Sequence, residues 1–289
     1  MIKLEKIAEI EHAALRGVFT HDNKILTQVL GNLGAYSIVD NKLVETDAYE
    51  SEEKETTDHI KGQKEFFTGI AADYREHGNE KYTSIFYGVD VSDENIKFIR
   101  TLNLKNGKME FDKRETSINN DASNLTVLNN NFIATSDGSY LSLYKTGSKV
   151  PQNIITQDIG LLVEKITPIE NNSLAVMTSG YSGRDKIHIM NIQENPYRLI
   201  EEKVIKFDAE NLGTITGIHY LGKDRFIVSS HNQLDSFNIV GGKVGNRASI
   251  PLENNSIVFN KDRNLMALFR TGFFAPSTPS IEVYNFSLD

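Results

Sequence analysis

The chain has 289 residues, of which 39% are hydrophobic and 24% are charged, a balance typical of a globular protein in water. Its net charge of −8 and its scattered Lys and Arg argue against a nucleic-acid groove, which needs clustered basic side chains. No apolar run approaches the length of a membrane span, and the lack of cysteine excludes disulfides, thiolate metal sites and cysteine nucleophiles.

The N-terminal segment reads MIKLEKIAEIEHAAL, which places acidic residues where a signal peptide would be apolar. We therefore expect the protein to be cytoplasmic. The alternation over residues 2–4 predicts a short strand. The spacing of Leu4, Ile7, Ile10 and Ala14 also fits a helix. The sequence leaves both alternatives open.

A unit of three short strands is clearest in residues 124–144. Aliphatic and aromatic residues fill segments 125–128, 132–135 and 140–144. Asn, Asp and Gly fill the turns between them, where a left-handed backbone or a local side-chain hydrogen bond is needed. This pattern predicts two consecutive β-hairpins.

The same unit recurs at five further positions, usually followed by a fourth, outer strand. Copy by copy, the predicted strands are 14–19, 25–30, 35–39 and 42–45; 66–72, 82–87, 96–104 and 108–111; 125–128, 132–135, 140–144 and 153–156; 163–169, 174–178, 186–192 and 199–207; 215–221, 226–230, 235–239 and 244–250; and 256–259, 265–269 and 280–286. In the second copy, we expect residues 73–81 to form a polar connection.

The second strands recur at intervals of roughly forty to sixty residues, which is the period of four-stranded propeller blades. No sustained helical period separates them. We therefore predict an all-β fold: a single closed β-propeller of six blades, each with four antiparallel strands. Seven blades would result if the wide interval 39–106 hides two short ones. The last copy lacks an outer strand, which the N-terminal segment could supply and so close the ring.

The third copy contains SDGSYLSLY, which resembles the turn and third strand of a WD40 blade. Tyr144 and Lys145 stand where that family often has Trp-Asp, the chain contains no Trp, and the Gly-His pair of the family is absent. The chain thus resembles the WD40-type β-propeller group in its strand period. The resemblance implies a fold and assigns no functional residues.

Two turns come close to catalytic motifs. Ser136, Asp137 and Gly138 fall one residue short of the sialidase-type motif Ser-x-Asp-x-Gly-x-Thr-Trp, so we interpret them as a hairpin turn. Residues 180–183 fall one residue short of Gly-x-Ser-x-Gly and lack its strand-to-helix context. We predict neither catalytic residues nor a cofactor.

The histidines form no local zinc-binding pair, because none is spaced as His-x-His or His-x-x-x-His. His188 and His219 fall in predicted strands, where we expect core or blade-interface packing. A calcium centre near the axis, with ligands from several blades, stays open; Asp235 and Asn238 of a third strand are the residues to check.

One face of a propeller collects the turns between second and third strands and the connections from blade to blade. We call it the loop face. Two adjacent phenylalanines in a Pro-rich loop there, beside an arginine, have the composition of an interaction hot spot, unless a ring packs inward. The predicted partner-binding residues are Arg270, Phe273, Phe274, Tyr181, Arg184, His231, Glu52 and Glu53.

The last two of these residues belong to the acidic segment 45–58, which is either a solvated loop or attracts a basic partner. The sequence therefore favours a non-enzymatic interaction platform that binds a protein or peptide through the loop face. The alternative is a lactonase-like propeller hydrolase with a divalent metal near the axis.

Overall fold

The computed structural model describes residues 1–12, 14–20, 22–29, 32–50, 65–77, 80–91, 96–106, 108–118, 124–128, 132–146, 151–170, 172–179, 185–207, 215–253, 256–270 and 278–288. These residues form strands and turns and contain no helix. In this part of the chain, therefore, no helix is long and apolar enough to cross a membrane.

The strands group into six antiparallel sheets of four strands each. Sheet by sheet, the strands are β2 (Arg16–Phe19), β3 (Ile25–Val29), β4 (Asn32–Val39) and β5 (Lys42–Glu50); β6 (Glu65–His77), β7 (Glu80–Val91), β8 (Ile96–Lys105) and β9 (Lys108–Ile118); β10 (Thr126–Leu128), β11 (Phe132–Asp137), β12 (Tyr140–Lys145) and β13 (Gln152–Asp158); β14 (Leu162–Ile169), β15 (Ser173–Ser179), β16 (Asp185–Gln193) and β17 (Arg198–Phe207); β18 (Ile215–Gly222), β19 (Arg225–Ser230), β20 (Gln233–Val240) and β21 (Lys243–Pro251); and β22 (Ser256–Asn260), β23 (Leu265–Arg270), β24 (Ser280–Leu288) and β1 (Ile2–Ile10).

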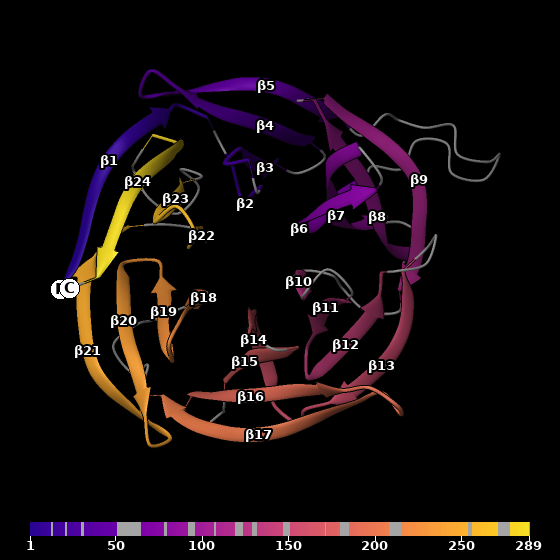
Figure 1. Ribbon diagram of the computed structural model, residues 1–289, viewed down its shortest axis with the longest axis vertical. Coiled ribbons are helices and arrows are strands. Elements are labelled where there is room, and N and C mark those ends of the chain that lie inside the picture. Colours follow the sequence, from indigo (N-terminus) through magenta and orange to yellow (C-terminus); the bar gives the residue numbers. More distant parts are fainter. Residues whose placement is uncertain are drawn as a thin grey trace.

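The six sheets are the blades of a β-propeller (Figure 1). The first strand of each blade lies nearest the axis, and the fourth strand lies at the rim. The predicted all-β, six-bladed fold is confirmed, and the seven-bladed alternative is wrong because β6 to β9 form one blade.

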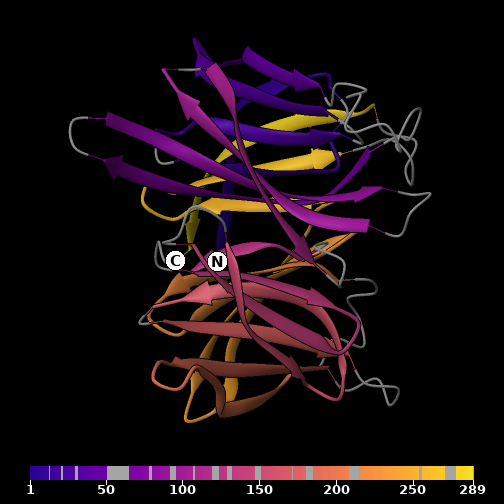
Figure 2. The same ribbon diagram turned by 90° about the vertical axis from the view of Figure 1, so that its right-hand side faces the viewer.

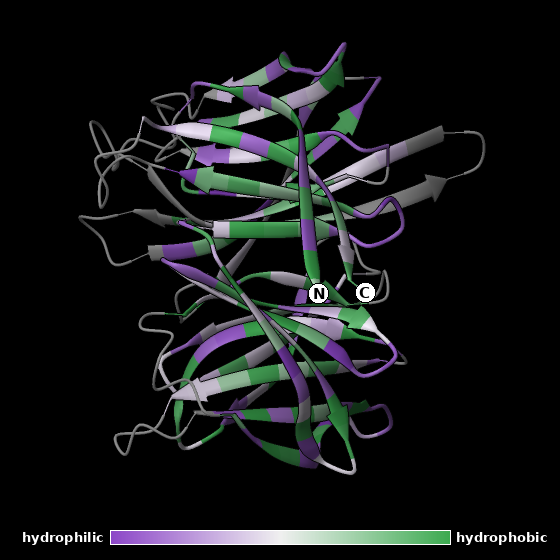
Figure 3. Cartoon of the chain, turned by 90° about the vertical axis from the view of Figure 1, so that its left-hand side faces the viewer, coloured by the Kyte–Doolittle hydropathy of each residue, from purple (hydrophilic) through white to green (hydrophobic). Residues whose placement is uncertain are grey.

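The two ends of the chain share the last blade, and they lie side by side in Figure 1 and Figure 3. β1 pairs antiparallel with β24, from Ile2 opposite Leu288 to Ile10 opposite Ile281. The helical alternative for this segment is therefore wrong. Its apparent helical spacing has a local cause: a bulge between Lys6 and Ala8 shifts the alternation of the strand by one residue.

Two predicted connections are strand instead. Residues 73–77 continue β6 and pair with β7 up to the couple His77 and Glu80, so the polar connection predicted for 73–81 is wrong. This long hairpin extends beyond the neighbouring blades in Figure 2. The acidic segment predicted as a loop begins with residues of β5, whose Glu50 pairs with Asn32. Backbone pairing outweighs side-chain polarity in both places.

The second strands are buried on both faces because the blades stack around the axis. In β15, residues 174–177 are all 0% exposed, which explains an apolar run without alternation. They pack in part with the next blade: the ring of Phe207, in β17 of the same blade as β15, lies 4.9 Å from that of Phe237 in β20 of the next blade, on which the ring of Phe226 is stacked. The core is thus made between blades.

A polar position recurs in the third strands. Glu282 pairs with Leu268 of the second strand, and the same register position can be followed in every blade. Five of its six members are buried polar or charged residues, and each follows a buried aliphatic residue. The six members, which we call the third-strand position, are Gly34, Arg100, Ser142, His188, Asp235 and Glu282.

Candidate functional site

A cavity of about 540 Å³ lies along the axis, and residues of the first strands of all six blades line it. These strands begin at the loop face, because each of them follows the connection from the preceding blade, and these connections lie on that face. Backbone contacts confirm this arrangement: the amide of Val163, at the start of β14, donates to the carbonyl of Gly138 in the β11–β12 turn at 2.8 Å. The axial cavity is therefore bounded by strand starts at the loop face.

The register of the blades assigns a level along the axis to each lining residue. Glu282 of the third-strand position pairs with Leu268, which pairs with Ile257 of β22. The residue before Ile257 is Ser256, and the same step in each blade gives the corresponding inner-strand residue. These residues, which we call the axial ring, are Arg16, Gly69, Asn124, Lys165, Gly217 and Ser256.

Lys165 lies in the axial ring next to Asn124, with its Nζ 3.5 Å from the Asn124 Oδ1. The Nδ2 of Asn124 donates to the Ser136 Oγ and to the Glu164 carbonyl, both at 2.9 Å. These two bonds turn the amide oxygen of Asn124 toward the lysine. The carboxylate of Glu164 in turn accepts a hydrogen bond from the Ser179 Oγ at 2.6 Å.

The charge on Lys165 is disfavoured where it lies. Burial, and then the nearby positive charge of Arg16, lower the pKa of Lys165 to about 8, although Glu164 acts in the opposite direction. Arg16 belongs to β2 of the first blade and Lys165 to β14 of the fourth. The axial ring thus places two cationic groups from opposite blades close together.

His219 lines the cavity two residues beyond the axial ring. Its ring packs against Phe259 at a centroid distance of 4.9 Å. A Cβ on Gly217 would lie 2.7 Å from the His219 Nε2 and 2.9 Å from the Ser229 Oγ, so only glycine leaves room for the imidazole here. Among the described residues, the Nε2 has no hydrogen-bond partner. Burial, and then the charge of Lys165, lower the pKa of His219 to about 4, so the imidazole is neutral at pH 7.

The predicted packing role is confirmed for both histidines, since His219 packs against Phe259 of the neighbouring blade, but their hydrogen bonding differs. In β16, His188 Nε2 is 3.0 Å from the Thr178 Oγ1, and its Nδ1 is 2.6 Å from the Glu201 carboxylate. These contacts engage both ring nitrogens, whereas His219 contributes an unpartnered nitrogen to the wall of a cavity.

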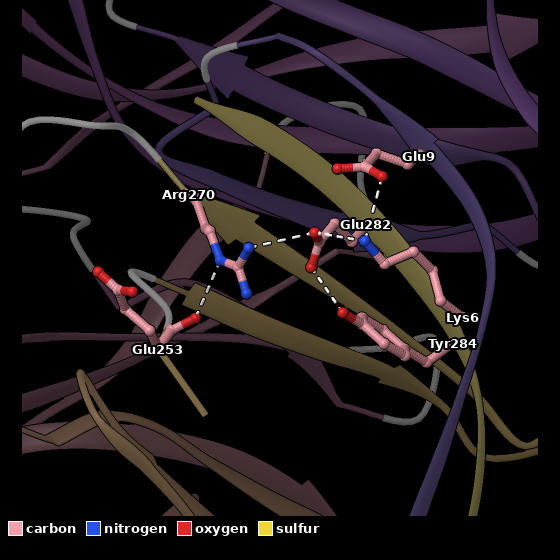
Figure 4. A network of polar contacts seen from close by, with 6 residues as sticks. All are labelled: Lys6, Glu9, Glu253, Arg270, Glu282 and Tyr284. Carbon is pink, nitrogen blue, oxygen red and sulfur yellow. Dashed lines mark hydrogen bonds and ion pairs between the residues drawn. The ribbon is translucent and has the colours of Figure 1, made fainter. Parts of the chain in front are cut away.

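Arg270, a predicted partner-binding residue, has structural contacts. Its Nη1 lies 3.1 Å from the carboxylate of Glu282, and its Nε donates to the Glu253 carbonyl at 3.2 Å (Figure 4). The same carboxylate accepts from Lys6 at 2.8 Å and from Tyr284 at 2.6 Å. The guanidinium therefore helps to hold the closing blade together.

His231 is brought to the axial cavity, because the turn between β19 and β20 places it in the cavity wall, half-buried. The other predicted partner-binding residues are not tested by the structure. Phe273, Phe274, Tyr181, Arg184, Glu52 and Glu53 lie outside the described residues.

Asp235, one of the residues considered for a calcium centre, is fully buried in an ion pair. Its carboxylate accepts from Arg247 Nη2 at 2.6 Å, from Gln233 Nε2 at 2.8 Å and from the Ser249 Oγ. Its oxygens are thus engaged within the blade. In the described part of the chain, no group of three or more His, Asp or Glu side chains is arranged to hold a metal ion.

Two large apolar side chains are exposed at the loop face. Tyr140, which follows the β11–β12 turn, is 46% exposed, and Leu162, the first residue of β14, is 52% exposed. The two segments are adjacent, as the contact between Val163 and Gly138 indicates. This face therefore offers apolar area beside a cationic cavity.

Sequence reasoning missed Arg16, Asn124 and Lys165. A signal was present, because Arg16 and Lys165 interrupt the apolar first strands predicted at 14–19 and 163–169. First strands line the axis of a propeller, so a charged residue there is exposed to the channel. The repeat alone could have singled out these two residues.

The chain is similar to known proteins in its fold and not in its sequence. No family model and no curated protein matches the sequence. A chain in the crystal structure of the mitotic checkpoint complex has a TM-score of 0.56 and 9% identity, over 94% of this chain and 89% of that one. The PQQ-bound aldose sugar dehydrogenase of Streptomyces coelicolor has a TM-score of 0.61 and 8% identity, over 99% and 98%. At such identities the likeness concerns architecture alone: the chain has the β-propeller fold.

Proposed function

We propose that the protein is a non-enzymatic interaction platform that binds a protein or peptide at its loop face. The observation that carries this proposal is the axial cavity, whose ring contains Arg16, Lys165 and Asn124. Tyr140 and Leu162 lie exposed on the same face. Apolar area around a polar pocket is the usual composition of a protein-binding surface.

The loops that the sequence predicts as binding elements belong to the same proposal. Phe273 and Phe274 would add aromatic contact area, with Tyr181 and Arg184 from a neighbouring loop. Glu52 and Glu53 would steer a partner that carries basic residues, an effect mainly on the association rate. His231 would contact the partner where it enters the cavity.

The resemblance to WD40-type propellers in strand period supports an adaptor role, since that group is built around partner binding. One similar structure is a chain of the mitotic checkpoint complex, so a propeller of this shape can work within an assembly. Both points concern the fold, and the residues of this chain carry the proposal.

The hydrolase alternative is less well supported by the lining of the cavity. A lactonase-like centre needs carboxylate and amide oxygens that converge on a cation. The described cavity lining contains Arg16, Lys165 and Lys261 and neither Asp nor Glu. The resulting positive charge would repel a divalent metal.

Affinity capture with cross-linking tests the proposal. The tagged full-length protein is used to capture partners from its source, and the cross-linked residues are identified by mass spectrometry. We expect cross-links at the loop face and weaker capture by the variant Tyr140→Ser with Leu162→Ser. The matched control is Val39→Ser with Val240→Ser, two exposed residues at turns of the opposite face. Cross-links confined to the rim or the opposite face would refute the proposal.

A further inference from the structure

The axial ring contains two cationic side chains, Arg16 and Lys165, on opposite sides of the axis and at the same register position. β2 and β14, which carry Arg16 and Lys165, belong to the first and fourth blades and face each other in Figure 1. Two like charges in a partly dehydrated place repel each other and disfavour the folded state. A negatively charged ligand between them would remove the repulsion.

The neighbouring groups orient the ring for such a ligand. Asn124 is held by its bonds to Ser136 and the Glu164 carbonyl, and its amide oxygen positions the Lys165 ammonium. The carboxylate of Glu164, the nearest acidic group of this strand, is directed to the Ser179 hydroxyl at 2.6 Å. The lysine charge is therefore positioned without being neutralised by a direct carboxylate contact among the described residues.

The wall beyond the ring is apolar in three of the six blades. Two residues further along the inner strands, the lining contains Val18, Ala71 and Val258, and the other blades contribute Thr126, Thr167 and His219. His219 lies at the same level, and its unpartnered Nε2 can exchange one hydrogen bond with a ligand. An acidic side chain that enters from the loop face could place its carboxylate between the two cations, with this wall and His219 beyond it.

We infer that the axial ring binds the carboxylate of an acidic residue of the partner, held by Arg16 and Lys165. This inference rests on the proposed function and adds that the partner contributes a carboxylate at the axial ring. A guanidinium binds a carboxylate through two parallel hydrogen bonds, and an ammonium adds a point charge. The chain as a whole has a net charge of −8, so this positive ring is a local exception in an acidic protein.

Calorimetric titration with defined probes tests the inference directly. The probes are a blocked tetraglutamate peptide, a blocked tetraglutamine peptide as the neutral control, and inorganic phosphate. We expect the wild-type protein to bind tetraglutamate and not tetraglutamine. Lys165→Met and Arg16→Gln should each weaken this binding by about tenfold or more, because each removes a charged hydrogen-bond donor. Lys165→Arg, which keeps the charge, should retain most of it.

The matched control is Lys261→Met, which removes a positive charge near the far end of the same cavity. Lys261 follows β22, whereas Ser256 of the axial ring begins it, so five residues of extended chain, roughly 16 Å, separate the two levels. This variant should bind tetraglutamate as the wild type does. Circular dichroism establishes that each variant is folded.

Three results would overturn the inference: no binding of tetraglutamate at millimolar concentration, equal weakening by Lys261→Met, or phosphate binding at least as tight as that of the peptide. The last would assign the site to phosphate. The captured partner separates this inference from the proposed function. Equal capture by wild type and Lys165→Met would leave the platform standing without a carboxylate site. Tetraglutamate binding without any captured partner would support the carboxylate site and count against the interaction platform.

Discussion

Glu282 of β24 accepts a hydrogen bond from Lys6 of β1 at 2.8 Å, although 276 positions separate the two residues in the sequence. The Glu282 side chain is only 3% exposed, and its carboxylate also accepts hydrogen bonds from Arg270 and Tyr284 (Figure 4). Burial raises the pKa of this carboxyl, but the hydrogen bonds from Lys6 and Tyr284 and the charge of Arg270 outweigh it, so the net pKa is lowered. The ring is therefore closed by a buried, ionised carboxylate as well as by backbone pairing.

Replacing Glu282 by Gln should lower the free energy of unfolding by about 2–4 kcal/mol at pH 7, because Arg270 and Lys6 lose their charged partner. Denaturant unfolding measures this. Since the folded pKa lies below the usual 4.5, the stabilisation is present above pH 4.5 and is lost as the pH falls through the folded value. The difference between wild type and variant should shrink in that acidic range. Glu9→Gln, at an exposed partner of Lys6, is the control and should change stability little.

Deleting residues 1–10 should open the last blade, because β1 is the outer strand paired with β24. We expect the thermal midpoint to fall by about 10 °C or more, since the strand contributes its backbone ladder and buried Ile2 and Ala8. Differential scanning calorimetry measures the midpoint. Substituting the exposed β1 residues Lys3 and Glu5 by Ser should cost less than about 1 kcal/mol. An unchanged midpoint after the deletion would mean that closure contributes nothing to stability.

Replacing Lys165 by Met should stabilise the protein at pH 7, because it removes a charge that burial and Arg16 disfavour. A fall in pKa from 10.5 to about 8 corresponds to at most about 3 kcal/mol. The unfolded chain binds more protons than the folded one between these two values, so wild-type stability rises there relative to the variant. The difference in the free energy of unfolding between variant and wild type, measured by urea unfolding, should decrease by about 1 kcal/mol from pH 7 to pH 9. A gap that stays constant with pH would contradict this assignment.

Replacing Phe273 and Phe274 by Ala should weaken binding of the captured partner by about tenfold or more, mainly through faster dissociation. Surface plasmon resonance with that partner separates the two rates. Val39→Ala with Val240→Ala removes exposed apolar groups from the opposite face and should leave both rates unchanged. Full affinity in the folded double-Ala protein would remove this loop from the binding surface.

Local chemistry made much of the fold predictable. Turns such as Ser136 to Gly138 and apolar runs such as 174–177 specify strands through interactions among a few neighbouring residues, and their repetition predicts blades. Prediction from side-chain patterns failed where the backbone pairing of two strands continues past their apolar residues. Residues 73–77 stay in β6 because β7 satisfies their backbone groups, and no side-chain pattern signals this.

The partner-binding residues were predicted from composition alone, and composition could not tell a presented side chain from a structural one. Arg270 looked like part of an aromatic hot spot, yet its guanidinium is engaged by Glu282, a residue beyond the loop in question. His231 did reach the cavity wall, since a turn between second and third strands lies beside the axis.

The sequence by itself determined most of the strand content and the blade repeat, because propensity, turn chemistry and alternation act over short distances along the chain. Only the tertiary structure decided which residues meet at the axis. Arg16, Asn124 and Lys165 come from three blades, and their common level depends on the register of each sheet and on the number of blades that close the ring. Contacts between residues so far apart in sequence arise when the ring closes, because only closure brings the first strands of opposite blades to face each other across one cavity.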